Sequence, residues 1–458
     1  MTDLLDQSAT AQIAALKNGR ISAQELMSAT LDRIAERNPS INAIVALQDR
    51  DTLLQAAAEA SGPLAGLPIA IKDLAETKGI TTTFGSPLFA DNVPEADSTM
   101  VAALKAAGAL VIGKTNTPEW GLGSHSYNPV YGVTRNPYNL NKSAGGSSGG
   151  AGAALAARMV ALADGSDMMG SLRNPAGWNN VFGFRPSLGL VAHSGPVDVF
   201  LGQLSTNGPM ARHIDDLELL LRVQSYKDPT NPHSCGPYVA TRDTCALRIG
   251  WLADWGAAYP MEPGVLPLCE AGLSTFEALG HQVVPLPPPV SAAALWDSWT
   301  KLRSWSIAEK SRALYEDPEQ RALLKPEAIW EVERGLTLSG AEIAKASKVR
   351  SDWFRTTAAM EVDIFALPSA QLFPFDAELD WPKEIAGTQM DTYHRWMEVV
   401  VPASLTGLPA LSVPVGFGPE GTPMGMQLIG HRGRDADILA LGRAYEMATG
   451  WTLRTPFE

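Results

Sequence analysis

The stretch AGGSSGGAGAALAARMVALADGSDMMGSLRNPA, residues 144–176, decides the fold, because it joins a glycine-rich loop, a helix-forming run and a second turn that carries a serine. Glycines, which lack a Cβ atom, let the backbone turn tightly on both sides of Ser147 and Ser148. The alanine-rich run AGAALAARMVAL, residues 151–162, predicts a helix directly after this loop. Irregular stretches as long as residues 137–195 are more often functional sites than linkers. We therefore expect the chemistry of the protein here.

Apolar runs of strand type alternate with helical runs on both sides of this stretch. LPIAIKDL (67–74), ALVIGK (109–114) and TPMGMQLIG (422–430) are typical of buried strands, whereas STMVAALKAAG (98–108) is typical of a helix. This alternation predicts an α/β fold whose central mixed sheet is mostly buried and flanked by helices.

The first helix near the N-terminus has a clear start. Ser22 stands three residues before Glu25, which is the capping-box pattern, and Pro39 is expected to end this helix. We expect a single domain over residues 1–458. Its parts are an N-terminal helical region at 1–65, a catalytic core at 66–225, a divergent helical region on the substrate side at 226–395, and a C-terminal part of the core at 396–458.

The region at 226–395 is rich in tryptophan. Nine of the 12 tryptophans fall between Trp251 and Trp396, and the segment from Trp296 to Met360 is predicted to be mostly helical. The aromatic side chains can be core anchors of packed helices, or some of them can line an apolar pocket. Both interpretations stay open at this point.

Composition excludes several classes of protein. Hydrophobic residues make up 45% of the chain, which is typical of a soluble globular protein. The formal charge of −13 and the lack of a basic run argue against nucleic-acid and anionic-membrane partners. No apolar run is long enough to span a membrane, no secretory signal is evident, and the three cysteines predict free thiols. These features favour a cytoplasmic location.

Two short motifs are misleading. GALVIGKT (108–115) matches the phosphate-loop pattern, but an apolar strand fills it and Pro118 follows, where a bare loop and a helix are needed. GGSSG (145–149) matches the nucleophile elbow, but residues 135–144 before it do not resemble the buried strand that an elbow requires. The seven histidines have no metal-ligand spacing, so we expect no metal site.

The remaining motifs are spread over nearly the whole chain. They are LPIAIKD (67–73), GKTNTPEWG (113–121), AGGSSGGAGAALAA (144–157), DGSDMMGSLRNPA (164–176), FGFRPSLG (182–189), PASLTGLPALSVPVG (402–416) and TPMGMQLIG (422–430). In this order they resemble the motifs of the amidase signature family, in particular of stand-alone aryl acylamidases and amidase-signature urethanases.

The resemblance implies a catalytic triad of Ser171, Ser147 and Lys72. Ser171 would be the nucleophile, Ser147 the bridging serine after a cis peptide bond, and Lys72 the base. Burial on an apolar strand would depress the pKa of Lys72, so that the neutral amine takes a proton from Ser171 through Ser147. No cofactor would be needed.

The resemblance also assigns supporting roles around the triad. The backbone N–H groups of Met168, Met169, Gly170 and Ser171 would form the oxyanion hole. Asp167 and Arg173 would pair to hold the turn rigid, although a plain surface ion pair is the alternative. Ser148 and Asn116 would support the site, and Met169, Gly123, Ser124 and Tyr127 would contact the substrate.

Two departures from the family pattern bear on the substrate. Family members commonly have a glycine where this chain has Met169, and many have a basic residue where it has Leu190. Both changes favour an apolar substrate, either an amide or a carbamate. The alternatives are the glutaminase component of a tRNA-dependent amidotransferase and a catalytically silent binding subunit. The expected partner is a small molecule, and the expected assembly is a monomer or homodimer.

Overall fold

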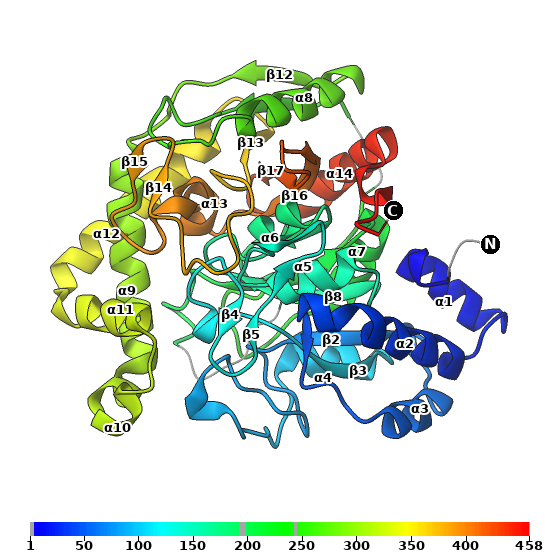
Figure 1. Cartoon of the computed structure of the whole chain (residues 1–458). Helices are drawn as coiled ribbons and strands as arrows, with labels where there is room; N and C mark the ends of the chain where they lie inside the picture. The colour runs from blue at the N-terminus through cyan, green and yellow to red at the C-terminus, as the bar shows by residue number, and fades with distance from the viewer. Residues whose placement is uncertain (1–3, 192–197, 242–244, 458) are drawn as a thin grey trace.

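The computed structural model describes residues 4–191, 198–241 and 245–457. An eleven-stranded sheet lies at its centre (Figure 1). Neighbouring strands pair in parallel in the groups β3-β2-β8 and β13-β11-β12, and antiparallel elsewhere. In spatial order the strands are β1 (Ile44–Val45), β3 (Leu110–Thr115), β2 (Pro68–Lys72), β8 (Leu162–Asp167), β10 (Thr206–Ala211), β9 (Phe182–Arg185), β16 (Ala410–Phe417), β17 (Pro423–Gly430), β13 (Ile364–Pro368), β11 (Arg248–Trp251) and β12 (Gln282–Pro285).

The strands at the centre of the sheet are buried on both faces. Every residue of β2, β9, β13 and β17 is buried. This burial explains why the runs at 67–74 and 422–430 are apolar rather than alternating. The predicted mixed, mostly buried sheet is therefore confirmed. Three small two-stranded sheets lie outside it: β4 (Tyr127–Asn128) with β5 (Gly132–Val133), β6 (Arg135–Asn136) with β7 (Asn139–Ser143), and β14 (Glu384–Ile385) with β15 (Thr388–Gln389).

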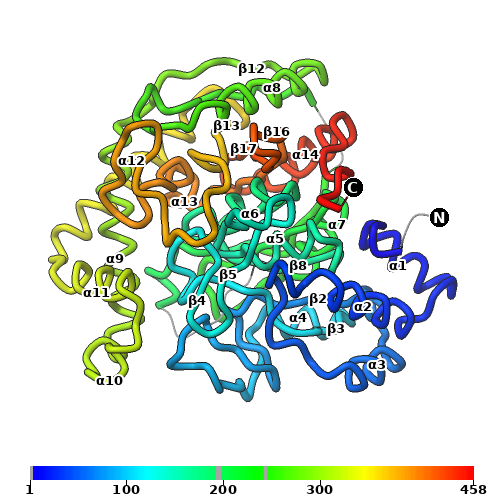
Figure 2. The backbone as a smooth tube through the Cα atoms, in the orientation of Figure 1, coloured from blue at the N-terminus to red at the C-terminus, as the bar shows by residue number. Residues whose placement is uncertain are grey.

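Helices cover the sheet, as Figure 2 also shows along the backbone. Short α5 packs against β8, and α6 packs against β16. Helix α14 packs between α7 and α8, where α7 contacts β10 and both α8 and α14 contact β16. The helices are α1 (Ala9–Lys17), α2 (Ala23–Ile41), α3 (Arg50–Ala58), α4 (Thr99–Ala106), α5 (Gly149–Ala156), α6 (Arg173–Trp178), α7 (Ile214–Gln224), α8 (Val265–Ala278), α9 (Ala292–Glu316), α10 (Pro318–Arg321), α11 (Pro326–Thr337), α12 (Gly340–Ala359), α13 (Val401–Thr406) and α14 (Asp435–Thr449). Short 3-10 helices lie at Leu4–Asp6, Pro87–Phe89, Glu119–Gly121, Arg395–Val400 and Trp451–Leu453.

Two helix boundaries differ from the prediction. The helix expected over 151–162 runs from Gly149 to Ala156, because Leu162 already begins β8 and pairs with β10. The capping box of α2 is confirmed, but Pro39 lies inside this helix, which continues to Ile41. A proline in the last turn removes only one hydrogen bond, so the helix can run past it.

The tryptophan-rich region forms a helical wall and also completes the sheet. Helices α9, α10, α11 and α12 pack together on one side of the molecule, at the left of Figure 1. The predicted helices from Trp296 to Met360 are thus confirmed, and the region 226–395 also supplies strands β11, β12 and β13. No helix within the described ranges is long and apolar enough to cross a membrane.

Candidate active site

Lys72 is the last residue of β2, and its side chain ends among serine oxygens. The Nζ atom donates to Ser147 Oγ at 2.8 Å, to Ser148 Oγ at 2.9 Å and to Ser166 Oγ at 3.1 Å. Burial lowers the pKa of the Lys72 ammonium from its ordinary value of 10.5 to about 7, and nearby carboxylates oppose this shift only in part. The predicted base is therefore buried, contacts the predicted bridging serine and can lose its proton near neutral pH.

A buried carboxylate holds the backbone of this lysine. The Asp164 Oδ1 atom accepts the Lys72 backbone N–H at 2.9 Å, and the Asp164 side chain is buried. Burial raises the pKa of the Asp164 carboxyl to about 6, against the attraction of the Lys114 and Lys72 cations. No role was predicted for Asp164 or Ser166 from the sequence, although both lie in the quoted stretch DGSDMMGS.

The glycine-rich loop places Ser147 and Ser148 directly before α5. The Gly146–Ser147 peptide bond is cis, as the family resemblance implies. The Ser148 N–H donates to the Ser171 carbonyl oxygen at 3.2 Å. This bond ties the loop to the turn at residues 168–172, the nucleophile turn, which carries the predicted nucleophile Ser171. A Cβ atom on Gly165 would lie 2.7 Å from Ser148 Oγ, so a glycine in β8 is needed for the close approach.

Ser171 lies between β8 and α6, and 6% of its surface is exposed. Within the described chain, no hydrogen bond joins its hydroxyl to that of Ser147, and the two serines are connected through the backbone of Ser148. The structure thus brings Lys72, Ser147 and Ser148 into direct contact and holds Ser171 beside them.

Asp167 and Arg173 form a buried ion pair, so the surface alternative is wrong. Both side chains are fully buried, with Arg173 Nε 3.0 Å from Oδ2 and Nη2 3.0 Å from Oδ1. Arg185, the arginine of FGFRPSLG, is a third member that was not predicted from the sequence, and its Nη1 lies 3.1 Å from Asp167 Oδ1. Burial alone would raise the pKa of the Asp167 carboxyl, but the two guanidinium groups hold it well below its usual range.

The arginine of this pair also ties the nucleophile turn to distant elements. Arg173 Nη1 donates to Gln427 Oε1 in β17 at 2.5 Å and to the Val400 carbonyl at 3.1 Å, and Nη2 donates to Ser404 Oγ in α13 at 2.7 Å. The turn that carries Ser171 is therefore fixed from several sides.

One of the four predicted oxyanion-hole amides is already occupied. The Gly170 N–H donates to Asp167 Oδ1 at 2.8 Å. The Asp167 carboxylate also accepts the Leu172 N–H at 3.2 Å. Of the four predicted amides, those of Met168, Met169 and Ser171 could still donate a hydrogen bond to a substrate oxygen.

The two methionines of the turn contact helix α9. Met169 is 3% exposed, and its Sδ accepts a hydrogen bond from Trp299 Nε1 at 3.2 Å. Met168 is half-buried, and its Sδ accepts from Arg303 Nη1 at 3.1 Å. Met169 therefore packs into the protein, and Met168 is the more exposed of the two.

Asn116 supports the loops around the site. Its Nδ2 donates to Thr134 Oγ1 at 3.0 Å, and its Oδ1 accepts from Asn128 Nδ2 at 2.7 Å. A Cβ atom on Gly150, in the first turn of α5, would lie 2.3 Å from the Asn116 backbone nitrogen. The Asn116 backbone is thus in close contact with the helix that follows Ser147.

The predicted substrate contacts Gly123, Ser124 and Tyr127 line one small cavity. The other side of this cavity comes from the start of α11, from residues 380–381 and from aromatic side chains near residue 395. Met169 does not line it.

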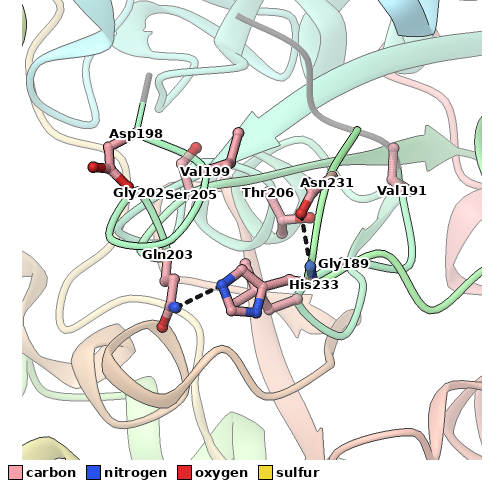
Figure 3. Close-up of a pocket in the computed structure, with 11 residues that line it drawn as sticks. Gly189, Val191, Asp198, Val199, Gly202, Gln203, Ser205, Thr206, Asn231 and His233 are labelled. Carbon is pink, nitrogen blue, oxygen red and sulfur yellow. Dashed lines mark hydrogen bonds between the residues drawn. The ribbon is translucent and has the colours of Figure 1, made fainter. Parts of the chain in front are cut away.

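A second cavity is lined by Gly189, Val191, Gln203 and His233, among others (Figure 3). In it, Gln203 Nε2 lies 2.8 Å from His233 Nε2, and Gln203 Oε1 accepts from Arg350 at 3.2 Å. None of the predicted site residues lines this cavity. One of its lining residues, Thr206, pairs with Asp167 across β10 and β8.

Comparison with known proteins decides the family. A family model described as Amidase matches residues 25–439. The chain belongs to the amidase signature family. As an amidase signature enzyme it is a hydrolase of carbon–nitrogen bonds.

Amidase signature proteins with similar sequences include two kinds. The chain is 32% identical to an acylamidase from Rhodococcus erythropolis, over 98% of this chain and 97% of the relative. It is 35% identical to the A component of the glutamyl-tRNA(Gln) amidotransferase from Thermus thermophilus, over 95% of this chain and 96% of the relative.

Solved amidase signature structures confirm the fold. A bacterial aryl acylamidase superposes with a TM-score of 0.90 at 28% identity, covering 97% of this chain and 96% of its own. A 6-aminohexanoate cyclic dimer hydrolase complexed with substrate superposes with a TM-score of 0.89 at 26% identity, covering 100% and 99%.

Proposed function

We propose that the protein cleaves amides of apolar or aryl substrates, with Ser171 as nucleophile and Ser147 and Lys72 as its proton relay. The observation that carries this proposal is the buried 2.8 Å contact between Lys72 Nζ and Ser147 Oγ. A lysine with a pKa of about 7 is about half neutral at pH 7, and a neutral amine can accept a proton.

The reaction proceeds in two halves. Ser171 Oγ attacks the carbonyl carbon while its proton passes to Ser147, and the Ser147 proton passes to Lys72. The carbon–nitrogen bond then breaks, and the proton on Lys72 returns through Ser147 to the leaving nitrogen. Water attacks the acyl-enzyme through the same relay and releases the acid. The Ser171 hydroxyl turns toward Ser147 when substrate occupies the site, since such contacts often tighten only in the complex.

The nucleophile turn stabilises the negative charge that develops on the substrate oxygen. The amides of Met169 and Ser171, with that of Met168, are the donors, since the Gly170 amide is directed at Asp167. Donors fixed before the reaction lower the barrier more than donors that must reorient. The Asp167 cluster with Arg173 and Arg185 provides this fixation.

The surroundings of the turn favour a neutral, apolar substrate. Met168 is half-buried and offers thioether surface beside Ser171, whereas Met169 and Trp299 are buried behind it and form an apolar support. The charge of Arg303 next to it is balanced by Glu331 at 2.7 Å. Carbamates present the same carbonyl to Ser171, with an alkoxide or aryloxide as the alternative leaving group, and are proposed as further substrates.

The glutaminase component of a tRNA-dependent amidotransferase is the second candidate. The 35% identity to the A component of the amidotransferase from Thermus thermophilus favours it. Free glutamine carries charged α-amino and α-carboxylate groups, and Arg303, which contacts Met168 of the nucleophile turn, is already paired with Glu331. We rank this function below hydrolysis of apolar amides for that reason.

Assays of the purified protein with p-nitroanilides, aryl carbamates and glutamine test the proposal. We expect the wild-type protein to hydrolyse anilides or carbamates, and Ser171→Ala and Lys72→Ala to lose about 10³-fold or more in kcat. Ser166→Ala is the matched serine control, because Ser166 contacts Lys72 but is no part of the relay. Full retention of hydrolysis by Ser171→Ala would overturn the mechanism. Glutaminase activity that appears only with partner subunits would assign the protein to the amidotransferase.

A further inference from the structure

The small cavity lined by Gly123, Ser124 and Tyr127 adjoins the loop that carries Ser147. A Cβ atom on Gly146 would lie 2.9 Å from the Ser124 carbonyl carbon, so the two backbones are in contact. Ser124, which lines the cavity, thus contacts the residue directly before the proposed bridging serine, Ser147.

The opposite wall of this cavity is connected to the nucleophile turn. Tyr393 lines the cavity, and its hydroxyl accepts a hydrogen bond from Arg303 Nη2 at 2.8 Å. The neighbouring nitrogen of Arg303 donates to Met168 Sδ at 3.1 Å. Ser124 therefore connects the cavity to the loop of Ser147, and Tyr393 connects it through Arg303 to the turn of Ser171.

Two side chains that line this cavity, Ser124 and Lys325, have more hydrogen-bonding capacity than their contacts use. Ser124 is 1% exposed, and within the described chain its Oγ has no hydrogen-bond partner. Buried hydroxyls are nearly always hydrogen-bonded, so an exception points to an absent group. The Lys325 side chain is 9% exposed, and its ammonium, which has three N–H donors, donates to the Leu122 carbonyl at 3.1 Å and lies 3.6 Å from Glu327.

The charges around the cavity exclude a carboxylate. Glu327 and Asp380 line it together with Lys325, so negative groups outnumber the positive one. Lys325 is itself paired with Glu327 and lies over the ring of Tyr127, at 5.4 Å from its centroid. The remaining walls are aromatic, from Trp381, Tyr393 and Trp396.

We propose that this cavity is a substrate subsite that binds a neutral carbonyl oxygen, with Ser124 Oγ and Lys325 Nζ as its donors. The proposal rests on the proposed function and narrows the substrate class to amides that carry a second, uncharged carbonyl, such as a ketone, ester, amide or carbamate. Two donors and aromatic walls fit such a group, whereas a free carboxylate would meet Glu327 and Asp380.

A matched series of anilides tests the subsite. Each acyl chain ends in a methyl ketone, a plain alkyl group of equal length, a carboxylate or an ammonium, over a range of chain lengths. We expect one chain length at which the ketone has a kcat/KM about tenfold above that of the alkyl chain, the size of one or two hydrogen bonds. Equal values for ketone and alkyl chains at every length, or a preference for the carboxylate or the ammonium, would overturn the proposal.

Variants assign the effect to the two donors. Ser124→Ala and Lys325→Met should each reduce the ketone-to-alkyl ratio toward one, whereas Lys345→Met, on the exposed surface of α12, should keep the wild-type ratio. A wild-type ratio in both cavity variants would overturn the assignment. The ratio compares two substrates on one preparation, so a general loss of folded protein cancels from it.

Binding to Ser171→Ala separates this proposal from the proposed function. Calorimetry measures the affinity of the same ketone and alkyl anilides without turnover. A ketone preference in binding, even if the wild-type protein cleaves no anilide, would support the subsite while the hydrolase proposal fails. Cleavage through Ser171 without any ketone preference would contradict the subsite alone.

Discussion

The Nζ atom of Lys72 lies 2.8 Å from the hydroxyl oxygen of Ser147, and both side chains are buried. A charged ammonium is disfavoured at such a depth, so burial turns a lysine into a base that works near neutral pH. In the proposed relay, this contact lets a serine nucleophile act without a histidine.

The pH dependence of hydrolysis follows from this contact. Since the base must be neutral, kcat/KM should rise with pH through about 7 and level off above it. Asp164→Asn keeps an oxygen for the Lys72 backbone N–H but removes a negative charge that favours the ammonium. The rising limb should therefore move to lower pH, by about one unit. Asp352→Asn, on the exposed side of α12, is the control. A rising limb of Asp164→Asn that stays at the wild-type pH or moves to higher pH would argue against Lys72 as the titrating base.

Lys72→Met should stabilise the protein while it abolishes hydrolysis. The pKa of Lys72 is 10.5 in the unfolded chain and about 7 in the folded one, so between these values only the unfolded chain holds the proton. This penalty on folding is about 5 kcal/mol at pH 7 and below, and it disappears as pH rises toward 10.5. Lost hydrogen bonds to the serines offset part of the gain.

Thermal unfolding at several pH values measures this effect. The Lys72→Met protein should have a higher Tm than wild type at pH 7, and the difference should shrink at higher pH. Lys348→Met, at an exposed ion pair, is the control. A Tm difference that grows with pH would contradict the assignment of a neutral, buried Lys72.

Arg185→Gln should destabilise the nucleophile turn. The change leaves the Asp167 carboxylate buried with Arg173 as its remaining cation, and loss of one partner from a buried charge cluster costs about 3–5 kcal/mol. Chemical denaturation should show this loss. Arg248→Gln, which removes a half-exposed ion pair with Glu361, should change stability by less than about 1 kcal/mol. Equal effects of the two changes would show that the cluster is not structural.

The two methionines of the nucleophile turn should respond differently to truncation. Met169→Ala leaves a hole beside Trp299 and should lower the free energy of unfolding by about 2–5 kcal/mol. Met168→Ala should cost less, since Met168 is half-buried, and should act mainly on the KM for bulky acyl groups. Calorimetry and steady-state kinetics of both variants measure the two effects. A larger stability loss for Met168→Ala would contradict the burial order.

Strands β2, β3 and β17 could be predicted from the sequence because each lies in a mostly apolar run. Such a run cannot by itself be divided between helix and strand, and this explains the error at residues 151–162, where Leu162 enters the sheet and the preceding alanines stay helical. The prediction that Pro39 ends its helix was wrong for another reason. A proline in the last turn of a helix disrupts little, and Pro39 lies in the last turn of α2.

Only those site residues could be predicted that lie in the family motifs and have a role there. Those motifs pointed to Lys72, Ser147 and Ser171, which are far apart in sequence. Spacing gave no indication that Arg185 reaches Asp167, because that contact depends on β9 lying next to β10 and β10 next to β8. The contact between Arg303 of α9 and Met168 likewise depends on the packing of a divergent helix.

The identity of the nucleophile is tested most directly by trapping the acyl-enzyme with an activated aryl carbamate. Cleavage after Lys142, Arg158 and Arg173 gives separate peptides, one with Ser147 and Ser148 and the next with Ser166 and Ser171. The proposed relay predicts that mass spectrometry finds the carbamoyl group on Ser171, and that it is absent from Ser171→Ala protein. A carbamoyl group on Ser147 or Ser148 of the wild-type protein would contradict it.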